Sequence, residues 1–269
     1  MPLSKKSELV AGLRAQIAEL ETPSSRDGQP QFQLGLAGLD ALLPEGGLAR
    51  GGVHEVVAGS YGDMAAAIGF AAALCVRARA GRYAGPIVWC QQNWGAYDMG
   101  SLYGPGLAGF GVDPSRLLLV NPAREPDMLW ALEECLRAGV LSAVVGEVPS
   151  SSRYFNLRAS RRLQLAAEDA QTPLVLLRGY GEGLSASAAV TRWRIASRPA
   201  RDRGDLLAAS QPCWDVTLEK CKGGPSFSRL LVWDGVQGCF EDAKDRASHK
   251  PSVALPIQAM EESLLSETG

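Results

Sequence analysis

Short apolar runs alternate with longer segments of helical spacing through the middle of the chain. Apolar runs separated by such helical segments are typical of a parallel sheet covered by helices on both faces. The expected strands are 53–58, 86–90, 117–120, 141–145 and 173–177. The expected helices are 64–80, 127–138 and 154–169. We therefore predict an α/β fold with a central, mainly parallel β-sheet flanked by helices.

The pattern changes after Ala189, where polar and apolar residues alternate along 192–196, 214–220 and 229–233. Alternation of this kind is typical of antiparallel strands with one exposed face. We expect the sheet to end in antiparallel strands.

The N-terminal segment 4–22 has the spacing of one amphipathic helix, and a polar linker follows it. The apolar stripe of this helix consists of Leu9, Leu13, Ile17 and Leu20. A lone amphipathic helix must bury its stripe, either on its own domain or on a partner. We predict an N-terminal helix and linker at 1–30, a core domain at 31–240, and a tail at 241–269 that is disordered or orders only on a partner.

Composition limits the possible functions. The 269 residues are 46% hydrophobic, which is enough to bury a full-sized core, and the formal net charge is −2. A balanced charge gives no overall attraction to a phosphate backbone. No apolar run approaches the length of a membrane span, and the first residues lack the apolar region of a signal peptide. We expect a cytoplasmic protein.

The six cysteines lie in or beside apolar segments, with no CxxC pair, and the chain has only two histidines. This distribution argues against a zinc site and a disulfide scaffold, so we expect buried or half-buried reduced thiols and no metal or other cofactor.

The order strand, glycine loop, helix at 53–80 is that of a nucleotide-binding phosphate loop, which requires GxxxxGK[ST]. The loop here contains Gly59 and Gly62, but Asp63, Met64 and Ala65 stand where the last glycine, the lysine and the magnesium-binding hydroxyl belong. The charge that grips the β and γ phosphates is absent, and Asp63 repels anions. We predict a degenerate phosphate loop, in which Asp63 is an ordinary acid in the first turn of a helix.

The segment from Leu34 to Gly59 resembles the opening of the RecA recombinase core, and the similarity continues along most of the chain. The strand that ends with the recombinase's catalytic glutamate is similar to Val88–Gln92, with Gln92 in that place. Glutamine cannot act as a general base. The strand that carries the Walker B aspartate is similar to the one ending at Gly146 or Glu147. This resemblance implies a RecA-like core that is not an enzyme.

Three further segments, at 160–168, 192–199 and 214–224, resemble the ImuA family of RecA-like or SulA-like bacterial proteins. This resemblance covers roughly residues 5 to 240. It implies an accessory role in SOS-induced translesion synthesis, with ImuB as a partner, and possible partners in RecA and an error-prone polymerase α subunit. It also implies that the protein associates with the nucleoid during DNA damage. RecA-like cores pair through their N-terminal segment, so 4–22 is the first candidate contact.

Two basic clusters are candidate contacts. Lys220 and Lys222 correspond to recombinase lysines that reach a neighbour's ATP, so the chain could cap a RecA filament; alternatively, they belong to a solvated edge strand. Arg158, Arg161 and Arg162 form a basic patch that meets DNA or an acidic partner, or else is a solvated helix face.

Direct DNA binding is expected to be weak, because the loops at 149–153 and 179–190 carry few basic or aromatic residues. Trp89 and Trp193 are expected in the core. Trp94, with Tyr97 and Tyr103, either packs beneath its loop or anchors a partner.

Two alternative functions remain open. One is a SulA-like cell-division inhibitor, and the other is a RecA-type ATPase with an atypical phosphate loop. Met64 and Gln92 argue against the ATPase.

Overall fold

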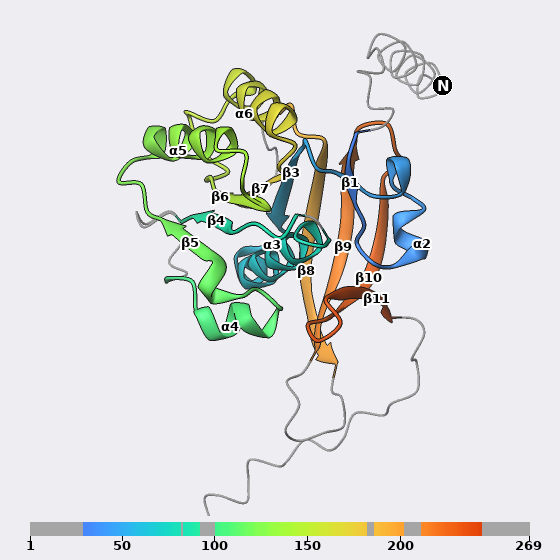
Figure 1. Ribbon diagram of the computed structural model, residues 1–269. Helices are drawn as coiled ribbons and strands as arrows, with labels where there is room; N and C mark the ends of the chain where they lie inside the picture. Colours follow the sequence, from blue (N-terminus) through green and yellow to red (C-terminus); the bar gives the residue numbers. More distant parts are fainter. Residues whose placement is uncertain (1–28, 82, 92–99, 182–185, 202–210, 244–269) are drawn as a thin grey trace, which may run out of the picture.

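A computed structural model of the chain describes residues 29–81, 83–91, 100–181, 186–201 and 211–243 (Figure 1). Its centre is a nine-stranded sheet of order β11-β10-β9-β8-β3-β7-β6-β4-β5. The strands are β3 (Val53–Ala58), β4 (Ile87–Cys90), β5 (Leu117–Val120), β6 (Ala143–Glu147), β7 (Leu174–Tyr180), β8 (Thr191–Arg201), β9 (Gln211–Cys221), β10 (Phe227–Asp234) and β11 (Cys239–Asp242). The six neighbouring strands β8, β3, β7, β6, β4 and β5 pair in parallel. At the other end of the sheet, β8, β9, β10 and β11 pair antiparallel. The predicted mainly parallel sheet with an antiparallel end is confirmed.

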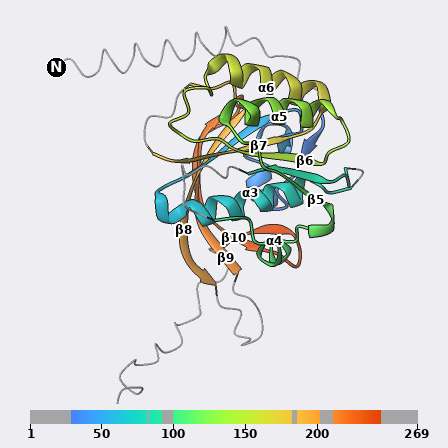
Figure 2. The ribbon, with the colours of Figure 1, turned by 90° about the vertical axis from the view of Figure 1, so that its left-hand side faces the viewer.

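Helices cover both faces of the parallel part of the sheet. Helix α3 (Met64–Ala78) packs on one face, against β3, β7 and β8, while α5 (Glu125–Arg137) and α6 (Leu157–Ala170) lie side by side on the other (Figures 1 and 2). The short elements are α2 (Ala37–Asp40), α4 (Gly104–Gly109), the 3-10 helices at Pro44–Gly46, Tyr61–Asp63 and Pro114–Arg116, and the two-stranded sheet of β1 (Gln31–Phe32) and β2 (Leu48–Ala49).

The larger of the two hydrophobic cores lies on the α3 side of the sheet. Trp89 and Trp193 are buried there, as expected, together with Phe70, Trp214 and Phe240. The segment Tyr61–Ala78, which includes α3, is long and apolar enough to cross a membrane by length and composition. Most of its apolar side chains are nevertheless buried in this core, which is the usual place of the central helix in an α/β domain.

The structure adjusts several predicted boundaries. Helix α6 begins at Leu157 because the Asn156 side chain accepts a hydrogen bond from the N–H of Ala159 at 3.1 Å and caps the first turn. Strand β11 includes the first two residues of the predicted tail, Glu241 and Asp242. All six cysteines are unpaired thiols, and two of them, Cys75 and Cys90, are buried. The predicted N-terminal helix and most of the tail lie outside the described residues.

Candidate functional site

The loop that the sequence predicts to be a degenerate phosphate loop connects β3, in the middle of the sheet, to the first turn of α3. The N–H of Gly59 donates to the carbonyl of Ile195 on β8 at 2.8 Å, so the loop is attached to the sheet at its start. A 3-10 turn at Tyr61–Asp63 follows, in which the N–H of Asp63 donates to the carbonyl of Ser60 at 3.1 Å. The loop therefore lies where the sequence places a phosphate loop, but one of its N–H groups is already bonded within the loop.

The Asp63 carboxylate lies in this loop and accepts hydrogen bonds both from the loop itself and from β8. One oxygen accepts from the N–H and the hydroxyl of Ser197, at 2.7 and 2.8 Å, and the other accepts from the hydroxyl of Ser60 at 2.7 Å. Partial burial raises the pKa of Asp63, but the hydrogen bonds from Ser60 and Ser197 outweigh burial and hold the pKa below its ordinary value. Asp63 therefore remains an anion in this loop, where its hydrogen bonds join the loop to β8.

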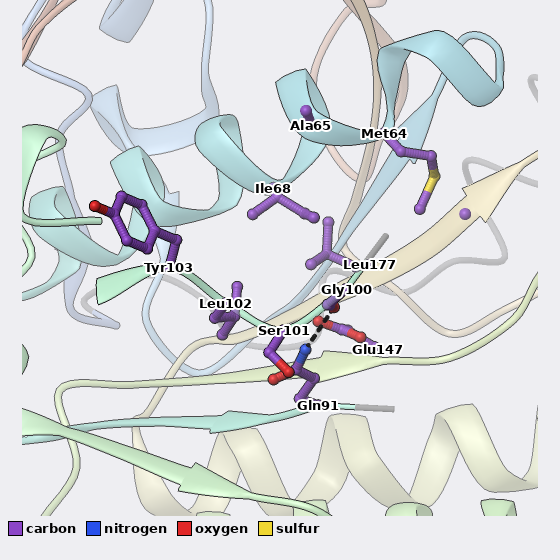
Figure 3. A pocket seen from close by; sticks show the side chains of 11 residues that line it. Met64, Ala65, Ile68, Gln91, Gly100, Ser101, Leu102, Tyr103, Glu147 and Leu177 are labelled. Carbon is purple, nitrogen blue, oxygen red and sulfur yellow. Dashed lines mark hydrogen bonds between the residues drawn. The ribbon is translucent and has the colours of Figure 1, made fainter. Parts of the chain in front are cut away.

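A cavity of about 190 Å³ opens beside this loop, at the carboxyl ends of β4, β6 and β7 (Figure 3). Ligands of open α/β sheets bind at this end of the strands. Its described lining residues are Met64, Ala65, Ile68, Gln91, Gly100, Ser101, Leu102, Tyr103, Glu147, Leu177 and Gly179. Among these residues there is no lysine or arginine, and three are large aliphatic side chains. The described lining therefore offers a triphosphate no cationic group.

Glu147 is the acid at the end of β6, where the sequence placed either Glu147 or Gly146. Its carboxylate lines the cavity and accepts a hydrogen bond from the indole N–H of Trp89 at 3.0 Å. Gly146 instead faces α5, where a Cβ atom would lie 2.6 Å from Cδ1 of Leu132. The buried Gln91 donates to the carbonyl of Gly100 at 3.0 Å across the cavity wall. Gln92, predicted in place of the catalytic glutamate, lies outside the described residues, as do Trp94 and Tyr97.

A buried group of charges, which the sequence analysis missed, lies beneath the other face of the sheet. Glu55 on β3 and Arg178 on β7 are fully buried, with Nη1 of Arg178 3.1 Å from Oε1 of Glu55. Nε of Arg192 on β8 lies 2.7 Å from Oε2 of the same carboxylate. The ring of Phe155 packs beneath the Arg178 guanidinium, 4.0 Å away. The sequence signal was a charged residue in or directly after each of three expected strands, but only the pairing of β7, β3 and β8 brings them together.

Lys220 and Lys222 do not lie on an edge strand, because β9 is paired with β8 on one side and β10 on the other. The alternative of a solvated edge is therefore wrong. The ammonium of Lys220 is half-buried and donates to the carbonyl of Ser187 at 2.9 Å, beside Arg192 in the β8–β9 register. Lys222 follows β9, and its N–H donates to the carbonyl of Val190 at 2.9 Å.

The predicted basic patch lies on α6, on the opposite side of the sheet from α3. All three arginines are exposed, and Arg162 is ion-paired with Glu133 on α5. The structure therefore brings Gly59, Gly62, Asp63, Met64 and Ala65 together in one loop and places the lysines and the patch elsewhere. The predicted partner contacts Leu9, Leu13, Ile17 and Leu20 lie outside the described residues.

No family model matches the chain. Two proteins named ImuA, from Caulobacter vibrioides strains NA1000 / CB15N and ATCC 19089 / CIP 103742 / CB 15, are each 34% identical to it over 210 residues. Each alignment covers 74% of this chain and 82% of the Caulobacter protein. With this identity over most of both lengths, the chain belongs to the ImuA family.

Proposed function

We propose that the chain is a non-catalytic, RecA-like accessory protein of DNA-damage-induced translesion synthesis, which works by binding proteins. Membership of the ImuA family supports the involvement in damage-induced mutagenesis. The resemblance that the sequence carries makes ImuB the principal partner, with RecA and an error-prone polymerase α subunit as further candidates.

The observation that carries this proposal is the Asp63 carboxylate in the phosphate loop. A phosphate loop binds because free N–H groups and a lysine converge on an anion. Here an anion of the chain itself already accepts hydrogen bonds from Ser60 and Ser197. Met64 and Ala65 supply neither the ammonium nor the hydroxyl group that ATP and magnesium require. A site without these groups neither grips a triphosphate nor activates water for its hydrolysis, so the function is binding without catalysis.

The open edge of the sheet at β5 is suited to a protein partner. Its outer side pairs with no strand among the described residues, and Leu118 and Leu119 on it are 54% and 47% exposed. Unpaired N–H and C=O groups beside exposed leucines favour the addition of a partner strand. We assign contacts with ImuB to this edge and to the N-terminal segment 4–22.

Contact with the end of a RecA filament is assigned to Lys222. The neighbouring Lys220 is bonded to Ser187 within the fold, so its charge is engaged by the chain itself. A cap of this kind offers its lysine to the ATP of the terminal RecA subunit. It provides no ATP site for a further subunit, because the loop at Asp63 binds none.

Co-purification of the full chain with ImuB and with RecA, each with and without ATP and single-stranded DNA, tests these assignments. We expect retention of ImuB under all conditions, and retention of RecA only when ATP and DNA have formed filaments. Lys222→Glu should abolish retention of RecA and leave ImuB bound, whereas the control Arg229→Glu should leave both bound. Failure to retain ImuB, or retention of the tubulin-like division protein instead, would overturn the proposal in favour of a division inhibitor.

A further inference from the structure

A groove runs between α5 and α6 on the helical face opposite α3. Two adjoining hollows there have volumes of about 280 and 710 Å³. Glu133 and Arg162 line both hollows, and their ion pair joins the two helices. Helices of 13 and 14 residues give this α5–α6 groove a length of about 20 Å. It is long enough for a short helix.

Large apolar side chains are exposed along the α5–α6 groove. Trp130 on α5 is 63% exposed, Tyr154 before α6 is 38% exposed, and Leu165 on α6 is 44% exposed. All three line one of the two hollows. Tryptophan, tyrosine and arginine are the residues most enriched at the energetic centres of protein interfaces. The surface is therefore composed like a binding site for an apolar segment.

The charge of the groove is positive at the Trp130 end. Arg158 and Arg162 line the hollow there against the single acid Glu133, which is already paired with both Arg162 and Arg137. Within the described part of the chain, no carboxylate forms an ion pair with Arg158 or with Arg161, one turn further along α6. An excess of one positive charge among apolar side chains suits an acidic amphipathic peptide better than a nucleic-acid backbone, which requires several cations along its length.

The chain itself carries a segment of this chemistry at 256–267. Ile257, Met260 and Leu264 have the spacing of one helical face, and three acids accompany them: Glu261, Glu262 and Glu267. Residues 251–269 contain no lysine or arginine. The other amphipathic segment, 4–22, carries three basic and three acidic residues and offers the groove no net charge. Of the two, charge complementarity selects 256–267.

The length of the segment also agrees with that of the groove. A helix of 12 residues is about 18 Å long, close to the length of the groove. The 12 residues between Ala243, the last described residue, and Pro256 span up to about 40 Å when extended. We propose that residues 256–267 bind the α5–α6 groove, with their apolar face on Trp130 and their acids against Arg158 and Arg161. The segment thereby covers this surface until a partner displaces it.

Photo-crosslinking in the full chain tests the proposal. With p-benzoylphenylalanine incorporated at Leu264, irradiation should give cross-links mainly to peptides from 125–137 and 154–163, identified by mass spectrometry. Arg158→Glu with Arg161→Glu should lower the cross-linking yield at least fivefold, while Arg229→Glu should not change it. Adding Glu261→Arg and Glu262→Arg to the charge-reversed chain should restore the yield, which distinguishes contact from a fold defect.

Cross-links to another surface, or a yield insensitive to the charges, would overturn the proposal. A labelled single-stranded oligonucleotide provides the second arm. Suppose that the expected cross-links are absent, and that the chain binds the oligonucleotide but loses this binding when Arg158 and Arg161 are reversed in charge. The groove would then be assigned to nucleic acid instead.

Discussion

Asp63 and Ser197 are 134 residues apart, yet the Asp63 carboxylate accepts both the N–H and the hydroxyl of Ser197, at 2.7 and 2.8 Å. This contact joins the loop before α3 to β8. In a working phosphate site the loop would wrap a ligand; here it is closed by hydrogen bonds within the protein. The acid that we expect to repel a phosphate also joins two parts of the fold.

Replacing Asp63 should therefore destabilise the protein without creating an ATP site. We expect Asp63→Ala to lower the free energy of unfolding by about 1 kcal/mol, because hydrogen bonds are lost from a carboxylate that is still partly exposed. Urea unfolding at pH 7 measures this. A variant as stable as the parent would show that the contact contributes nothing.

The contribution of Asp63 should depend on pH. Its pKa in the folded protein is below the ordinary value of 3.8, so its stabilisation is present above that value and is lost as pH falls through the folded pKa. The stability difference between the parent and Asp63→Asn should accordingly shrink at pH 3 and below. A difference that is constant from pH 7 to pH 3 would contradict the assigned pKa shift.

The buried charges at Glu55 predict a much larger effect on stability. Glu55→Gln removes the negative charge that Arg178 and Arg192 share beneath the sheet, and removing one partner of a buried pair costs about 3–5 kcal/mol. The matched control is Asp215→Asn, which breaks the exposed pair with Arg198 and should cost less than about 1 kcal/mol. Equal losses in the two variants, measured by denaturant unfolding, would refute this prediction.

Gly146 lets α5 approach the sheet beside the acid Glu147. In Gly146→Ala the added Cβ would lie 2.6 Å from Leu132, so the Leu132 side chain must move, at a cost of about 1–3 kcal/mol. Gly104→Ala is the control, because its Cβ would meet nothing within 4 Å. A thermal midpoint for Gly146→Ala no lower than that of Gly104→Ala would count against close packing here.

The parallel core was predictable because its strands are continuous apolar runs, and the same reasoning placed Trp89 and Trp193 inside. The departure of Asp63, Met64 and Ala65 from the phosphate-loop pattern is visible in the sequence alone, since these residues are adjacent. The contact between Asp63 and Ser197 could not be predicted, because Ser197 becomes a neighbour of the loop only through the pairing of β3 with β8. Register likewise brings Lys220 beside Arg192 and makes β9 an inner strand. The alternative of an edge strand at Lys220 was wrong because alternation alone does not reveal that another strand pairs on the far side of β9.

Equilibrium binding of ATP to the purified full chain, with and without magnesium, tests the central claim most directly. Isothermal titration calorimetry should give no saturable heat up to millimolar ATP, and Asp63→Ala should behave in the same way. Micromolar, magnesium-dependent binding by the parent chain would contradict the account.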